Sequence, residues 1–296
     1  MNFHHFLLTR FNLPLWTEDK HGHSIDRSVW LEGRLRLFEK YCLPSVCVQI
    51  FQDFTWILLC DENTPLEYRE RIKEYRKQCP QIELIQVEEG YAWDFPNIFS
   101  EIVTSILEEK GAQQGDICMT TQLDNDDALH KDYLSEINKE INTLCRDSVR
   151  ENPIFLSYNY GLQYFTNLNM ATKVKYPNNH FMTCVESVHK ANDGIASVGT
   201  CFGYGSHFLI EKNLGMNVHH IVDKSRPMWC EVIHKDNVDN DVKMTFDTEI
   251  VRDLDIMRNE FNVDTLIQVN LFSFAIKGIG QVFRRTKGKF IKRRWR

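Results

Sequence analysis

Short apolar runs alternate along the first half of this 296-residue chain with longer segments whose apolar residues recur at helical spacing. The runs are rich in β-branched and aromatic residues and have the length of strands. They occupy residues 5–11, 55–60, 82–87 and 117–123, and the helical patterns occupy residues 31–51, 66–78, 98–109 and 128–144. This alternation predicts an α/β fold with a mainly parallel sheet that helices flank on both faces.

The pattern changes after about residue 150, where short runs typical of strands follow one another. These runs occupy residues 153–158, 161–168, 171–176 and 208–211, and a late acidic helix is expected at residues 246–261. Some of the strands are expected to be antiparallel. No linker separates the two halves, so we expect one domain over residues 1–275 and a tail at residues 276–296.

The tail differs from the rest of the chain in charge. Residues 277–296 contain nine Lys and Arg residues and no acidic residue, so removing them from the formal net charge of −6 leaves −15 for residues 1–276. Phe, Ile, Val and Trp are interleaved with these cations, which predicts an amphipathic segment on an anionic membrane surface. A solubilising tail and nonspecific nucleic-acid binding are the alternatives, but no motif supports a specific nucleic-acid partner.

Cysteine usage and the N-terminal residues bear on the compartment. The nine cysteines include no Cys-x-x-Cys pair, which predicts reducing surroundings and no disulfide framework. Residues 1–16 lack the basic start of a signal peptide, and Arg10 interrupts their apolar run. We therefore expect a cytoplasmic protein, peripheral through its tail on the inner face of the bacterial cytoplasmic membrane.

Four polar side chains directly follow the apolar run at residues 117–123. They are Asp124, Asn125, Asp126 and Asp127. In a mainly parallel sheet, ligands bind beyond the carboxyl ends of the strands, and a second acidic turn begins at Asp61, after another such run. Carboxylates that a strand holds in place suit Mg²⁺ or Mn²⁺, which prefer oxygen ligands and bind phosphates. The turn is therefore a candidate metal and phosphate site.

The residues of this turn allow other interpretations. Asp126 or Asp127 would cap a helix beginning at Ala128, although one Asp is enough for a cap. An EF-hand loop is excluded, because its oxygen ligand and glycine at the fifth and sixth positions are replaced by Ala128 and Leu129. A phosphohydrolase with an Asp-x-Asp turn stays an alternative.

Four stretches together resemble GT-A glycosyltransferases, which transfer sugars from nucleotide-diphospho-sugar donors. They are HHFLLTRFN (His4–Asn12), FEKYCLPSVCVQIFQDFTWILLCDENTP (Phe38–Pro65), TTQLDNDDAL (Thr120–Leu129) and MWCEVIHKDNVDN (Met228–Asn240). More narrowly, they resemble the family named "putative rhamnosyltransferase", and the middle two resemble the inverting family-2 pattern. The resemblance implies a GT-A fold with a nucleotide-binding half at residues 1–150 and an acceptor half at residues 151–275. Gln122 departs from the pattern, in which Arg is more frequent before the acidic turn.

By position, the resemblance implies a metal site. Asp124 and Asp126 correspond to the DXD motif, with Asp126 as the principal ligand. His234 corresponds to a third protein ligand that many GT-A enzymes supply from their second half, and its imidazole suits Mn²⁺ better than Mg²⁺. A partly buried structural histidine is the competing interpretation of His234.

The resemblance also implies contacts to the donor from Arg10, Asp61, Asp124 and Asn125. Arg10 would contact the pyrophosphate or the base, and Asp61 the base or the ribose. A strand-end ion pair is the alternative for Arg10, and turn formation is the alternative for Asp61. Trp93 and Asp94 would border the nucleotide pocket, with core packing as the competing role of Trp93.

An inverting transfer needs a carboxylate that takes the proton of the acceptor hydroxyl. The second half offers four candidates: Glu186, Asp193, Asp247 and Glu249. We slightly prefer Asp193, followed by Glu186. The glycine-rich run at residues 194–205 is expected to form a mobile acceptor-side loop.

These features predict a metal-dependent glycosyltransferase (a hexosyltransferase) of polysaccharide biosynthesis. It would move a sugar, with rhamnose as a candidate, from a nucleotide-sugar donor to a cell-surface glycan or a lipid-linked acceptor, with inversion. Two alternatives stay open, because a fold hosts many functions. One is a metal-dependent phosphohydrolase, and the other is a non-catalytic protein that binds nucleotides or glycans on the same fold.

Overall fold

The computed structural model describes residues 2–15, 18, 24–88, 90–144, 152–191, 194–213, 215–234 and 248–272. Seven strands form the main sheet in the order β12-β6-β9-β4-β1-β2-β3. Their bounds are β1 (Phe3–Arg10), β2 (Phe54–Asp61), β3 (Ile82–Val87), β4 (Ile117–Gln122), β6 (Ile154–Tyr158), β9 (Thr183–Ser187) and β12 (Asn217–Ile221). Strands β1 to β4 are parallel to one another, whereas β9 is antiparallel to both of its neighbours.

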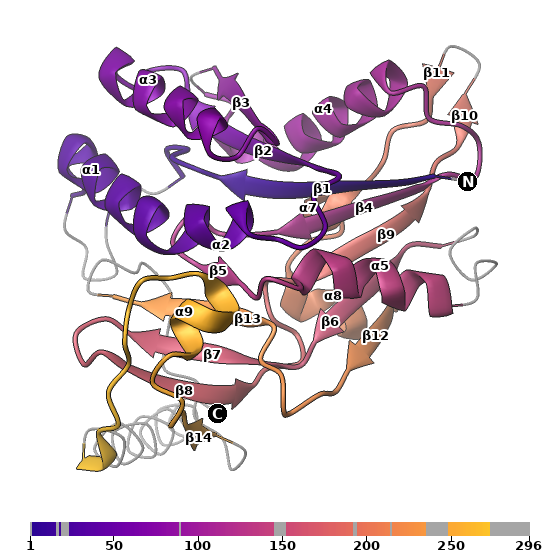
Figure 1. Ribbon diagram of the computed structural model, residues 1–296. Coiled ribbons are helices and arrows are strands. Elements are labelled where there is room, and N and C mark those ends of the chain that lie inside the picture. Colours follow the sequence, from indigo (N-terminus) through magenta and orange to yellow (C-terminus); the bar gives the residue numbers. More distant parts are fainter. Residues whose placement is uncertain are drawn as a thin grey trace, which may run out of the picture.

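Helices cover both faces of the main sheet. Successive residues of a strand point to opposite faces, and the strands carry apolar residues on both, so each face needs a covering layer. In β1, Leu7 packs into one core cluster, and Phe6 and Leu8 pack into the other. The first cluster lies under α1 (Arg27–Leu37), the π-helical turn η1 (Phe38–Cys42), α2 (Leu43–Cys47), α3 (Leu66–Glu74), η2 (Tyr75–Lys77) and α5 (Tyr133–Thr143). The second lies under η3 (Ala92–Asp94), α4 (Phe95–Glu109), α7 (Thr200–Gly203) and α8 (His207–Asn213) (Figure 1).

A second sheet lies beside the first, at the lower left of Figure 1. Its strands, in the order β14-β8-β7-β13-β5, are β14 (Glu249–Ile250), β8 (Met170–Lys175), β7 (Tyr160–Phe165), β13 (Trp229–Ile233) and β5 (Ala128–Leu129). Helix α9 (Ile256–Phe261) packs on this sheet through a third apolar cluster. Residues 123–127 connect β4 of the main sheet with β5 of the second sheet, so the acidic turn lies at the junction of the two sheets.

A short hairpin lies at the opposite end of the main sheet, near the N-terminus of the chain (Figure 1). It consists of β10 (Lys190–Ala191) and β11 (Gly194–Ile195). The backbone N–H of Ile195 donates to the carboxylate of Glu108, at the end of α4, and Gly115, which precedes β4, donates to Val188. The hairpin therefore belongs to the amino edge of the sheet, away from the acidic turn.

The predicted α/β class and mainly parallel sheet are confirmed, and the strand expected at residues 82–87 coincides with β3. The helix expected at residues 128–144 is wrong in its first part. Ala128 and Leu129 form β5, because they pair with Cys230 and Trp229 of β13, and the helix begins only at Tyr133. The helix-cap interpretation of Asp126 and Asp127 is therefore wrong.

Two further elements differ from expectation. Residues 208–211 form part of α8 and not a strand, since a short apolar run fits either structure. The single helix expected at residues 246–261 is wrong over residues 249–255, because the structure has strand β14 there and α9 begins at Ile256. Residues 246 and 247 lie outside the described part of the chain. Among the described helices, none has the length and apolar character needed to cross a membrane.

Gly161 of β7 offers a test of the packing between the sheets. A Cβ at this position would lie 2.1–2.3 Å from atoms of the Trp229 ring, which is fully buried and stacked on Phe181. We expect Gly161→Ala to lower the free energy of unfolding by about 1–3 kcal/mol through overpacking. Gly33→Ala in α1 is the control, because no atom lies within 4 Å of its Cβ position. It should raise stability by up to about 1 kcal/mol, and equal effects of the two changes in urea denaturation would contradict the prediction.

Candidate functional site

The backbone of the acidic turn is held between β1 and η1. Leu123 donates its N–H to the carbonyl of Leu8, at 3.1 Å, and the side-chain amide of buried Asn125 donates to the carbonyl of Phe11. The thiol of Cys42 in η1 lies 3.6 Å from the carbonyl of Asp124. The turn is therefore fixed in place at the carboxyl edge of the main sheet.

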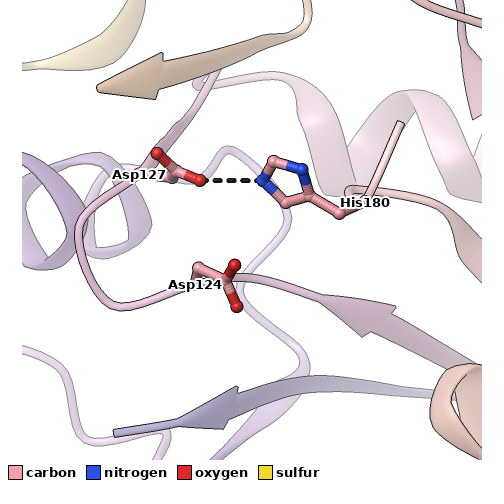
Figure 2. Close-up of side chains that lie close together, drawn as sticks. All are labelled: Asp124, Asp127 and His180. Carbon is pink, nitrogen blue, oxygen red and sulfur yellow. Dashed lines mark hydrogen bonds and ion pairs between the residues drawn. The ribbon is translucent and has the colours of Figure 1, made fainter. Parts of the chain in front are cut away.

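Asp127 ties the turn to the second half of the chain. Its side chain is fully buried; Oδ1 accepts the N–H of Val232 in β13 at 2.8 Å, and Oδ2 lies 2.8 Å from Nε2 of His180 (Figure 2). Burial raises the pKa of Asp127 to about 7, and the neighbouring carboxylates of Asp126 and Asp124 add to this effect. Burial lowers the pKa of His180, but the bond to Asp127 and the nearby charges of Asp127, Asp124 and Glu231 together outweigh burial and raise it. Asp127 therefore ties the turn to β13 and to the segment before β9.

Asp126 is held by two other basic side chains. Its Oδ2 lies 2.5 Å from Nη1 of Arg34 in α1 and 2.8 Å from Nε2 of His234, which directly follows β13. Burial opposes ionisation of Asp126, but the Arg34 charge and the His234 bond outweigh it and hold the pKa of this carboxyl well below its usual value. The sequence placed Asp126 and His234 in one site, and the structure brings them into contact.

Asp124 is the most exposed of the three acids, at 34% of its side chain, and it pairs with Arg10 at the end of β1. Nη2 of Arg10 lies 3.2 Å from Oδ1 of Asp124. Burial alone would raise the pKa of Asp124, but the charge of Arg10 lowers it. The guanidinium also lies 5.0 and 5.3 Å from the ring centres of Phe95 and Phe202, so the pair lies beside an aromatic surface from α4 and α7.

The donor atoms of the turn suit a divalent cation. Among the described residues, Asp124, Asp127 and His180 are the set of three whose ligand atoms all lie within 4.8 Å of one another. Asp126 and His234 are two further donors in the same turn region, with Nε2 of His234 2.8 Å from Oδ2 of Asp126. Carboxylate oxygens together with an imidazole nitrogen form a donor set that Mn²⁺ and related cations accept.

Other residues predicted for donor binding lie at the same edge. Asp61 ends β2, next to β1. Its carboxylate accepts the N–H of Asn63 at 2.9 Å, so the turn-forming role left open by the sequence is present. Trp93 in η3 is 59% exposed, which excludes core packing as its role. Asp94 accepts a bond from Asn97 at 2.6 Å.

Of the two preferred candidates for the base, the structure describes only Glu186. Glu186 of β9 pairs with Cys118 near the beginning of β4, and its carboxylate accepts bonds from Gly199 N, Thr200 N and Tyr204 Oη. Asp193 lies outside the described residues. Because β9 runs antiparallel to β4, Glu186 lies toward the amino edge of the sheet, and the identity of the base stays a prediction.

The other two candidates for the base lie in the segment that contains β14. Glu249 is 51% exposed on its side chain and pairs with Lys224, at 2.9 Å, on the second sheet. Asp247 lies outside the described residues. The described part of this segment therefore shows no link to the acidic turn.

Sequence reasoning missed three residues that contact or support the turn. They are Trp30, Arg34 and His180. Trp30 and Arg34 are four residues apart on α1 and therefore share a face, but the sequence alone did not show that this face meets the turn. His180 lies in a segment without a recognisable motif. Its role depends on contacts between residues that are 53 apart in the sequence.

Asp127 should be important mainly for stability. Asp127→Ala leaves the buried N–H of Val232 and the imidazole of His180 without their acceptor, so we expect a loss of about 3 kcal/mol in the free energy of unfolding. Asp124→Ala should cost less than about 1 kcal/mol, because that pair is partly exposed. Urea denaturation of both variants measures the difference, and equal losses would contradict the structural role given to Asp127.

The chain is similar to known glycosyltransferases in sequence and in structure. A family profile described as "Putative rhamnosyl transferase" matches residues 4–245, well over half of the chain. No curated protein sequence matches. Among solved structures, S. aureus TarS has a TM-score of 0.40 and 11% identity, covering 79% of this chain and 37% of TarS. S. aureus TarS 1–349 in complex with UDP-GlcNAc has a TM-score of 0.38 and 11% identity, covering 80% of this chain and 60% of that one.

This chain thus spans 37% and 60% of those two TarS chains. This structural likeness is distant, whereas the family profile matches most of the chain. The match includes β1, the acidic turn, β13 and His234. The chain belongs to the glycosyltransferase family described as "Putative rhamnosyl transferase".

Proposed function

We propose that this protein is a metal-dependent, inverting glycosyltransferase that takes a sugar from a nucleotide-sugar donor. The observation that carries the proposal is the carboxylate of Asp126, which lies at the carboxyl edge of the sheet between a guanidinium and an imidazole. A divalent cation would take the place of Arg34 beside this carboxylate, and parallel sheets bind ligands at this edge. The family match supports glycosyl transfer, and its description favours rhamnose as the sugar.

We assign Asp126 and His234 as the principal metal ligands, with Asp124 beside them. Asp127 is a poorer ligand because both of its oxygens already accept bonds within the fold. A Mn²⁺ or Mg²⁺ ion held by these residues would offset the negative charge that develops on the leaving nucleoside diphosphate. Asp127 and His180 then act by positioning the turn that carries the ligands.

We assign the donor contacts to Arg10, Asp61 and Asn125. The guanidinium of Arg10 is the cation closest to Asp124 and suits a phosphate group. Asn125 acts mainly by holding the turn, since its amide is bonded to the carbonyl of Phe11. Asp61, at the end of the next strand, is assigned to the ribose or the base.

In the proposed reaction, an acceptor hydroxyl attacks the anomeric carbon on the face opposite the leaving group. A C–O bond to the acceptor forms as the bond to the diphosphate breaks, and the hydroxyl proton passes to a general base. The acceptor is proposed to be a cell-surface glycan or a lipid-linked sugar. The phosphohydrolase is the second candidate function, because it would use the same acids without a sugar acceptor.

Asp126→Asn tests the metal assignment without changing the size of the side chain. In thermal-shift assays with a panel of dTDP-, UDP- and GDP-sugars, we expect Mn²⁺ together with one nucleotide sugar to raise the melting temperature of the wild type. The variant should lose this stabilisation. Turnover of the active donor should fall about 100-fold or more in the variant. Asp264→Asn, at a carboxylate that is 90% exposed, is the control and should behave as wild type. Absence of any nucleotide effect, together with hydrolysis of a simple phosphate ester, would favour the phosphohydrolase.

We further propose that the basic tail brings the enzyme to an anionic membrane surface, where a lipid-linked acceptor resides. The tail, residues 276–296, lies outside the described residues, so this proposal rests on its composition. Leu271 and Phe272, shortly before the tail, are 65% and 76% exposed. Their exposure supports an apolar contribution to the same contact.

Co-sedimentation with lipid vesicles tests the membrane proposal. We expect the full chain to bind vesicles that contain phosphatidylglycerol and to bind neutral phosphatidylcholine vesicles weakly, because each cation near an anionic surface contributes about 1 kcal/mol. A full-length variant with the nine cations of residues 277–296 changed to Gln should lose this preference. Equal binding of the two proteins to the anionic vesicles would exclude the proposal.

A further inference from the structure

We infer that Arg34 is a diphosphate-binding residue that changes partners during donor binding. It holds Asp126 when the site is empty, and it binds the diphosphate of a nucleoside diphosphate when donor and divalent cation are present. This inference rests on the proposed function and adds a residue that neither the motif pattern nor the family match assigns to the site.

The position of Arg34 is well defined by its surroundings. Helix α1 is capped by Asp26, which accepts the N–H groups of Ser28 and Val29, and it is anchored in the core by Leu31 and Leu35. Figure 1 shows α1 beside the end of β1. The guanidinium of Arg34 lies 5.2 Å from the centre of the Trp30 ring, and the side chain is 11% exposed. A stacked, largely buried guanidinium loses little conformational freedom when it binds a ligand.

The donors of Arg34 are only partly used by the protein. Among the described residues, Arg34 donates through Nη1 alone, to Oδ2 of Asp126 at 2.5 Å and Oδ1 of Asn125 at 3.3 Å. A guanidinium has five N–H donors in a plane that matches phosphate oxygens. Nε and Nη2 therefore remain for an anion that enters the site.

Charge explains why Arg34 must change partners. Oδ2 of Asp126 accepts both Arg34 and His234, and a divalent cation on that carboxylate would lie within a few ångströms of the guanidinium. Like charges at such a distance in a buried site repel strongly. The diphosphate enters together with the cation and carries the negative charge that Arg34 loses when it leaves Asp126. The same argument predicts that Arg34 competes with the metal when no nucleotide is present.

Two binding measurements on the full chain test this exchange. Mn²⁺ alone is titrated by the EPR signal of the free ion, and UDP, GDP and dTDP are titrated by calorimetry in the presence of Mn²⁺. We expect Arg34→Gln to bind Mn²⁺ alone about threefold more tightly, because a competing charge is gone. The same variant should bind the preferred nucleoside diphosphate about tenfold more weakly. Arg34→Lys should change both affinities in the same directions by less.

Arg36→Gln is the matched control. Arg36 lies on the same helix, is 73% exposed and pairs with Glu32, so both affinities should equal those of wild type. Unchanged Mn²⁺ binding or unchanged nucleotide binding in Arg34→Gln would overturn the inference; if that variant does not fold by circular dichroism, Arg34→Lys decides on the same two readouts. A wild-type protein that binds no nucleoside diphosphate would overturn the proposed function as well, whereas normal nucleotide binding by a folded Arg34→Gln would overturn this inference alone.

Discussion

Three carboxylates within four residues can be held in a protein interior only if basic side chains or other hydrogen-bond donors lie within hydrogen-bonding distance of them. In this protein, Arg10 pairs with Asp124, Arg34 and His234 pair with Asp126, and His180 pairs with Asp127. These four partners come from β1, α1, the segment before β9 and the end of β13. The charge balance of one short turn therefore fixes the relative positions of segments from both halves of the chain.

The three acids have different partners, and these give them different roles. Asp127 is fully buried with both oxygens bonded, so it is part of the framework. Asp124 is partly exposed, and Asp126 is bonded to Arg34, which a cation would displace in the proposed exchange, and to His234, the second proposed ligand. Neighbouring acids of the same chemical type thus differ because their surroundings differ, and a DXD motif in a sequence does not reveal which acid is structural.

The sequence predicted the elements that depend on local pattern. β3 agrees at both ends, and β4 ends where the acidic turn was expected. It did not predict β5, because Ala128 and Leu129 become a strand only by pairing with β13, about a hundred residues later. For the same reason the reversal of β9 was missed, and with it the distance of Glu186 from the turn.

The site residues were likewise predicted where a motif was present and missed where contacts are long-range. Asp126 and His234 were placed together through the resemblance to GT-A enzymes, and they are in contact. Arg34 and His180 were missed because neither belongs to a motif and both meet the turn through long-range contacts. A sequence therefore predicts the acids of such a site more easily than the cations that balance them.

The position of the acidic turn between the two sheets has a consequence for biosynthesis. β1 to β4 and their helices lie within the first 122 residues, but His180, Val232 and His234 are made much later. While a nascent chain lacks these partners, the turn keeps uncompensated negative charge and must stay hydrated. The carboxyl edge of the sheet therefore takes its final form only after the last third of the chain has emerged from the ribosome.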